Sequence, residues 1–138
     1  SPSGAERYGA RARAAVYAQM HRLLERSLVA RESVIVDATY LARHDRDRLA
    51  RVVRGYGWRH VFLACEAAEA VVRERLDARD ASVASDARFD TYLAQRNDRD
   101  LYGGDEAVLR LDTGRPLGAV RHDLLPRLWA WRQGRPAA

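Results

Sequence analysis

Asp37 is the first residue whose type and position point to chemistry. It follows the short apolar run Val34-Ile35-Val36, which is typical of a strand buried on both faces. In open α/β sheets, ligands bind beyond the carboxyl ends of the strands. A carboxylate there suits Mg²⁺, which binds through one or two carboxylates together with phosphate oxygens. Alternatively, Asp37 only caps the turn after the strand.

Arg75 and Arg79 are the second candidate group. They are four residues apart near the end of a predicted helix, so they are expected to share a face. The loop at residues 80–85 and another predicted helix follow, and two guanidinium groups on such a flap could clamp a transferring phosphoryl group. Alternatively, this is an exposed face on which the arginines pair with neighbouring acids, namely Glu74, Asp77 and Asp80.

The third candidate is the turn after the last predicted strand. A strand-end loop containing Gly and Pro can cover a planar base, although it can equally be a plain connection. Its polar and ring-bearing residues are Asp112, Thr113, Arg115 and Pro116. The four histidines show no metal-ligand spacing, and Cys65 is interpreted as a small apolar filler at the end of a buried strand.

Composition sets bounds on the class of protein. The 138 residues, 47% hydrophobic and 31% charged, are enough for one globular domain. No apolar run is long enough to cross a bilayer. All 24 basic residues are arginines, and the formal net charge is +5. This reflects either a general bias toward arginine or a use of its planar fork for phosphate. Without lysine, the chain cannot contain the phosphate-binding motif Gly-x-x-x-x-Gly-Lys-Ser/Thr.

Hydrophobic periodicity predicts helices that alternate with strands. This order indicates an α/β fold, a three-layer parallel sheet flanked by helices. Helices are expected at residues 10–29, 43–54, 67–78 and 85–96, with a last one carrying Leu124, Leu125, Leu128 and Trp129. The first helix is expected to be amphipathic, with one apolar face formed by Val16, Met20, Leu23, Leu24 and Leu28. Strands are expected at residues 33–37, 60–65 and 107–112, and a frayed tail at 133–138.

Several of these features together resemble one family. They are Val34-Ile35-Val36-Asp37-Ala38-Thr39-Tyr40-Leu41, the Arg/Asp-rich helix after it, the strand ending at Cys65, and Arg75-Leu76-x-x-Arg79. The chain resembles the P-loop kinases grouped with polynucleotide 5′-kinase, gluconate kinase and zeta toxin. It is especially similar to the ATP-binding half of fusions with an aminoglycoside-phosphotransferase-like domain.

The resemblance implies ATP, Mg²⁺ and transfer of the γ-phosphoryl group to a hydroxyl. It places Asp37 at the metal, Arg75 and Arg79 among the lid arginines on the phosphates, and the turn of residues 112–116 near adenine. Thr39 and Arg43 fall where the family lines the acceptor pocket.

The resemblance also implies a first strand and a P-loop upstream of Ser1. We therefore expect residues 1–138 to form a single partial domain, incomplete at the N-terminus, with residues 80–85 as a lid loop. Its expected partners are the upstream segment of the same polypeptide, ATP, and a small molecule or nucleic-acid end that carries a hydroxyl. No membrane association is expected, and the expected location is the cytoplasm. The alternatives are an arginine-rich module that binds nucleic acid and a module whose sheet is completed by a partner strand.

Overall fold

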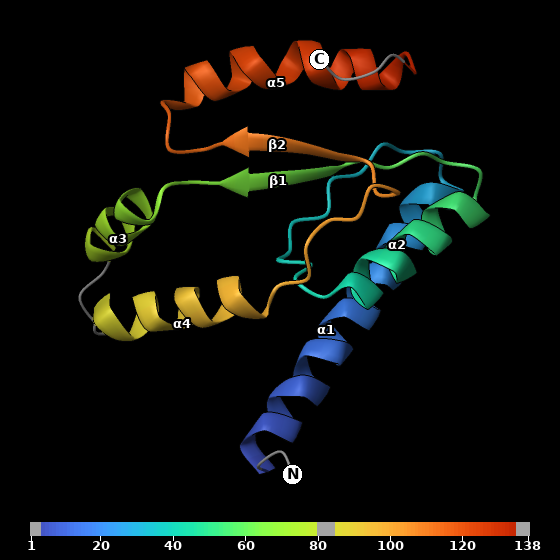
Figure 1. The fold of residues 1–138 in the computed structure, drawn as a ribbon. Coiled ribbons are helices and arrows are strands. Elements are labelled where there is room, and N and C mark those ends of the chain that lie inside the picture. The colour runs from blue at the N-terminus through green and yellow to red at the C-terminus, as the bar shows by residue number, and fades with distance from the viewer. Residues whose placement is uncertain (1–3, 80–84, 135–138) are drawn as a thin grey trace. The chain divides into compact units, whose positions relative to one another are not determined.

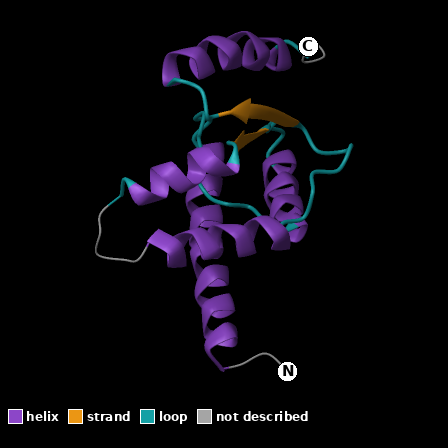
Figure 2. Ribbon diagram, turned by 60° about the vertical axis from the view of Figure 1, so that its left-hand side comes forward, coloured by secondary structure: helices purple, strands orange, loops and turns teal. Residues whose placement is uncertain are grey.

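The computed structural model describes residues 4–79 and 85–134; for 4–8 and 85–87 it describes the backbone alone. The chain divides into two compact units, Ser1–His60 and Val61–Ala138. Helices make up most of the described chain, as Figure 2 shows. Of the predicted lid loop, residues 80–84 lie outside the described residues, as does the tail at 135–138.

The first unit contains the helices α1, Gly4–Val29, and α2, Arg43–Gly55, which pack against each other. The buried side of α2 consists of Arg46, Leu49, Ala50 and Val53, whose spacing of three and four residues keeps them on one face. The helix predicted at 43–54 is thereby confirmed, and Gly57, with φ of 75°, supports the turn after it.

The helix predicted at 10–29 is confirmed as part of the longer α1, but its buried face differs from the prediction. Val16 and Leu23 were expected inside, yet they are 57% and 50% exposed. The buried stripe consists instead of Tyr17, His21, Leu24 and Leu28. The stripe is rotated because the polar tips of Tyr17 and His21 find hydrogen-bond partners in the segment that connects the two helices.

The strand predicted at 33–37 is wrong for this structure. Residues 32–37 are irregular, and Ile35 is 93% exposed. A β-branched run has extended propensity, but a strand forms only when a neighbouring strand receives its backbone hydrogen bonds. Within this unit, the described residues include no other strand.

The second unit contains the two described strands, β1, Phe62–Glu66, and β2, Val108–Asp112. They pair in parallel, with Phe62 opposite Val108 and Glu66 opposite Asp112. Figure 1 shows both arrows pointing the same way, with α5, Leu117–Arg132, beside β2. The strands predicted at 60–65 and 107–112 are confirmed in position. These helices and strands are those of an α/β chain, although the predicted three-layer sheet is represented in the described residues by two strands.

Helices α3, Glu69–Asp77, and α4, Ser85–Asp98, follow β1 and contact each other. Burial in this unit is concentrated in Ala64, Phe89, Leu109 and Leu111. Cys65 is exposed, so its predicted role as a buried filler is wrong. Because side chains alternate along a strand, Cys65 and Leu63, itself 40% exposed, share a face of β1 that their unit leaves partly open.

The last helix, α5, continues through Pro126 and has no buried residue. Leu125 and Trp129, expected to pack inward, are 57% and 59% exposed. No helix within the described ranges has the length and apolar character needed to cross a membrane.

Candidate functional site

The carboxyl ends of β1 and β2 meet at one edge of the sheet, because the two strands run in parallel. Glu66 and Asp112 are opposite each other at this edge. Thr113 ties the two ends together: its backbone N–H donates to the Glu66 carbonyl at 2.7 Å, and its hydroxyl donates to the same oxygen at 2.9 Å. The turn at 112–116 therefore has a defined position relative to both strands.

Within that turn, Asp112 and Gly114 form a local cap. The Gly114 N–H donates to Asp112 Oδ1 at 2.9 Å, a side-chain-to-backbone bond typical of turns. A Cβ atom on Gly114 would lie 3.0 Å from the same oxygen and 3.8 Å from Val71 Cγ2. An alanine here would therefore crowd the Asp112 side chain, which would have to shift by a few tenths of an ångström. Arg115 and Pro116 are exposed, and Pro116 stands at the N-cap of α5.

Arg75 reaches this turn from α3. Its Nη2 donates to the Thr113 carbonyl at 2.5 Å, between residues 38 positions apart in the sequence. The structure thus brings together a predicted lid arginine and the predicted base-covering turn. This bond uses one of the five guanidinium N–H donors, and the side chain is exposed.

Arg79 is placed differently from Arg75. Helix α3 ends at Asp77, and Ala78 is its C-cap, so the exposed Arg79 lies just beyond the helix. Its N–H donates to the Leu76 carbonyl at 3.3 Å. The shared helical face of the two arginines stays a prediction. The structure does not pair either arginine with Glu74 or Asp77, and Asp80 lies outside the described residues.

Glu66 is a charged residue at this edge, and its position next to Cys65 in the sequence suggested that it helps shape the site without indicating how. Arg110 Nη1 donates to its Oε1 at 2.7 Å, and Arg99 Nη1 lies 3.9 Å from the same oxygen. The signal in the sequence was its position directly after the strand. Its side chain is 39% exposed, so it can shape the charge of the edge.

Asp37, Thr39 and Arg43 belong to the other unit, where they lie on or next to the connection between α1 and α2. Asp37 is exposed. Arg43 Nε forms an ion pair with Asp47 Oδ2 at 3.4 Å. Thr39 is exposed, and its hydroxyl lies 3.3 Å from that of Tyr17.

The His, Cys, Asp and Glu side chains of the described residues can be compared with what the predicted Mg²⁺ site requires. Within residues 4–79 and 85–134, no three His, Cys, Asp or Glu residues gather into a cluster that could hold an ion. A site that relied on protein ligands alone is therefore not built in the described part. The single exposed carboxylate of Asp37 fits the sparser mode of Mg²⁺, in which phosphate oxygens and water complete the shell.

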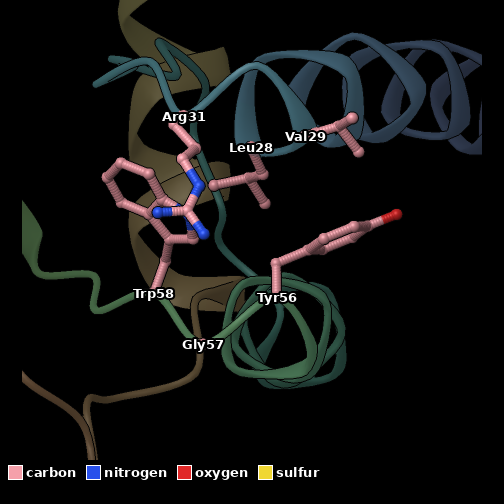
Figure 3. A pocket seen from close by; sticks show the side chains of 6 residues that line it. All are labelled: Leu28, Val29, Arg31, Tyr56, Gly57 and Trp58. Atoms are coloured by element: carbon pink, nitrogen blue, oxygen red, sulfur yellow. The ribbon is translucent and has the colours of Figure 1, made fainter.

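A cavity of about 480 Å³ lies in the first unit, between the end of α1 and the turn after α2. Figure 3 shows Arg31 reaching from the end of α1 toward that turn. The lining residues are Leu28, Val29, Arg31, Tyr56, Gly57 and Trp58. The cavity contains none of the predicted catalytic or binding residues.

The helices and the parallel strand pair are consistent with an α/β fold, with an arginine at the strand-end turn. Residues 2–101 match the family model described as an AAA domain, a span of more than half the chain. The chain therefore belongs to this family, whose members have the P-loop fold and a nucleotide-binding, kinase-like function. The predicted resemblance is thus confirmed for the P-loop kinase-like family as a whole, while the resemblance to particular members and to the fusion proteins stays a prediction. Neither the curated proteins nor the solved structures contain a match.

Proposed function

We propose that this chain forms part of an ATP-dependent phosphotransferase domain, which transfers the γ-phosphoryl group of ATP to a hydroxyl. One observation carries the proposal: in a chain that matches an AAA domain, the guanidinium of Arg75 contacts the turn at the carboxyl ends of β1 and β2. Nucleotides bind at this edge in open α/β sheets. An arginine there suits the phosphates because its fork binds their oxygens in pairs.

Catalysis in this proposal consists of positioning and charge neutralisation, because phosphoryl transfer needs little covalent chemistry from the protein. Arg75 and Arg79 bind the phosphates and oppose the charge that develops on the transferring group. The turn from Asp112 through Thr113 to Arg115 and Pro116 covers the base. Arg75 links the two functions through its bond to the Thr113 carbonyl.

The first unit contains the other residues to which the proposal gives a role. Asp37 is the residue that would hold Mg²⁺, which when bound would neutralise phosphate charge. Thr39 and Arg43 line the acceptor pocket, where the hydroxyl of a small molecule or of a nucleic-acid end is oriented. Arg43 is paired with Asp47, and this ion pair restricts the position of the Arg43 guanidinium.

Residues 1–138 contain no lysine, so they lack the Walker A lysine that contacts the β- and γ-phosphates. We propose that a P-loop upstream of Ser1, in the same polypeptide, supplies it. The sequence encoded there is expected to contain a strand followed by Gly-x-x-x-x-Gly-Lys-Ser/Thr. A different sequence upstream would contradict this part of the proposal.

The test measures transfer of ³²P from γ-labelled ATP by a polypeptide that includes the upstream segment. Small polyols and 5′-hydroxyl oligonucleotides serve as separate acceptors, and Arg75→Lys, which keeps the charge but loses the fork, is the matched variant. Transfer that depends on Mg²⁺ and falls in Arg75→Lys supports the proposal. Salt-dependent oligonucleotide binding without transfer would instead favour the arginine-rich binding module.

The 138-residue chain by itself is expected to bind MgATP weakly, since the backbone amides of a P-loop supply much of the phosphate binding. Isothermal titration measures this directly. Micromolar affinity of the isolated chain would show that these 138 residues suffice to bind the nucleotide. It would contradict the proposal that an upstream P-loop supplies much of the phosphate binding.

A further inference from the structure

Tyr40 lies between Thr39 and the start of α2, and its backbone has an unusual conformation, called the bend below. The φ angle of Tyr40 is 41°, in the left-handed region that bulky residues rarely adopt. Such a conformation persists only when the surroundings hold it. Because Thr39 immediately precedes Tyr40, whatever holds Tyr40 also constrains the direction of Thr39.

Three hydrogen bonds from two helices hold the bend. From α1, the Tyr17 hydroxyl accepts the Tyr40 N–H at 3.0 Å. From α2, Arg46 Nη1 donates to the Tyr40 carbonyl at 3.0 Å and to the Leu41 carbonyl at 3.1 Å. Tyr17 is 8% exposed and Arg46 only 1%. Buried bonds of this kind are costly to lose, because the partner left behind is cut off from water.

The Tyr17 hydroxyl also contacts a proposed acceptor residue directly. It lies 3.3 Å from the hydroxyl of Thr39. A hydroxyl has one donor and two acceptor positions, so Tyr17 can accept the Tyr40 N–H and exchange a second hydrogen bond with Thr39. One buried oxygen therefore orients both the backbone of the bend and an exposed threonine side chain.

The Tyr40 ring points into the unit, away from any role in binding a ligand. It packs edge-on against Tyr17, with ring centroids 5.1 Å apart and an interplanar angle of 84°. Its hydroxyl lies 3.3 Å from His21 Nε2. Burial, followed by the nearby Arg48, lowers the pKa of His21, while the charges of Asp45 and Glu25 raise it. The bonds to Tyr17 and Arg46 involve the backbone of Tyr40 and not its hydroxyl, so Tyr40→Phe keeps both and serves as a control.

We infer that Tyr17 and Arg46 are positioning residues of the acceptor side: they fix the bend at Tyr40 and thereby present Thr39. This inference rests on the proposed function. In the proposed reaction, neither Tyr17 nor Arg46 touches the reacting atoms. Loss of the Tyr17 hydroxyl is expected to impair use of the acceptor and to leave use of MgATP unchanged.

The matched pair of variants is Tyr17→Phe and Tyr40→Phe, since each removes one phenolic hydroxyl from the same buried cluster and keeps its ring. Amide hydrogen exchange of Tyr40, measured by NMR on the full chain, reports on the bend without any activity. Protection is expected to fall by about tenfold or more in Tyr17→Phe, because the amide loses its buried partner. In Tyr40→Phe, protection of residue 40 is expected to stay close to that of the parent.

Kinetics of the polypeptide with the upstream segment complete the test. In Tyr17→Phe, the KM for the acceptor is expected to rise severalfold while the KM for MgATP stays unchanged. Equal losses of protection in both variants, or an unchanged acceptor KM once the bend is loosened, would overturn the inference. Absence of phosphoryl transfer in the parent would instead reject the proposed function, and the exchange data would still decide whether Tyr17 holds the bend.

Discussion

Replacing Arg46 with methionine tests how the first unit is held together. Arg46 has the largest fully buried side chain of the described residues. Its guanidinium donates to the carbonyls of Tyr40 and Leu41 at 3.0 and 3.1 Å. Methionine has a similar length and fills irregular space well, but it has no donor. The substitution therefore removes the hydrogen bonds and the charge and keeps most of the packing.

Two effects of opposite sign determine how much the substitution changes the free energy of unfolding. A buried carbonyl that loses its donor costs about 1–3 kcal/mol. Removal of a buried cation relieves a desolvation penalty, which can offset much of a buried ionic interaction. The bond to the Leu41 carbonyl is only partly buried, so water can replace that donor. We therefore expect a loss of about 1–3 kcal/mol in the free energy of unfolding, the cost of one stranded carbonyl.

The assay is urea unfolding followed by tryptophan fluorescence. In a background with Trp129→Phe and Trp131→Phe, the signal comes from Trp58 in the first unit. Arg51→Met, an exposed position on the same helix, is the control and should change stability by less than about 0.5 kcal/mol. If Arg46→Met is as stable as the parent, relief of the desolvation penalty outweighs the hydrogen bonds, and the proposed hold on the bend is refuted.

Three further predictions concern the strand-end turn and the buried histidine. In the polypeptide with the upstream segment, Arg75→Ala should lower kcat by about 10²-fold or more while barely changing Tm, because its bond to the Thr113 carbonyl is exposed; equal losses in both would indicate a structural role. Gly114→Ala should destabilise the turn by about 0.5–1.5 kcal/mol, since the new Cβ would crowd Asp112 Oδ1; unchanged amide chemical shifts in the turn would contradict this. Burial lowers the pKa of His21, so the stability contributed by neutral His21 is fully present above pH about 6.5 and is lost as the pH falls from there to the folded-state pKa, because the unfolded chain binds the proton first. Urea unfolding midpoints of the parent and of His21→Asn, measured at pH about 7.5 and 5.5, check this. Identical pH profiles of the two proteins would exclude His21 as the cause.

Local sequence predicted the secondary structure best where the apolar pattern and the packing agree. The helix at 43–55 is an example, because Leu49 and Val53 face inward with the expected spacing. It was less informative for α1, where polar Tyr17 and His21 are buried and Leu23 is half exposed. Hydrophobic periodicity ranks side chains by polarity, so it cannot anticipate that a hydroxyl and an imidazole will be buried against hydrogen-bond partners.

The candidate site was predicted residue by residue, but not as a set of contacts. Glycine and proline near Asp112 indicated a turn after a strand, and the turn is there. The bond between Arg75 and Thr113 joins residues 38 positions apart, and it depends on the parallel pairing of β1 with β2. No local pattern contains that information.

The sequence by itself determined the positions of α2, β1 and β2, the arginine-only basic charge and the absence of a Walker A lysine from these residues, because each depends on residue identity or short-range spacing. The tertiary structure alone decided that residues 33–37 do not form a strand, that Tyr40 adopts a left-handed bend held by Tyr17 and Arg46, and that Arg75 contacts the strand-end turn. These outcomes depend on which donors and acceptors meet in space, since a buried polar group requires a partner and a strand requires a neighbour.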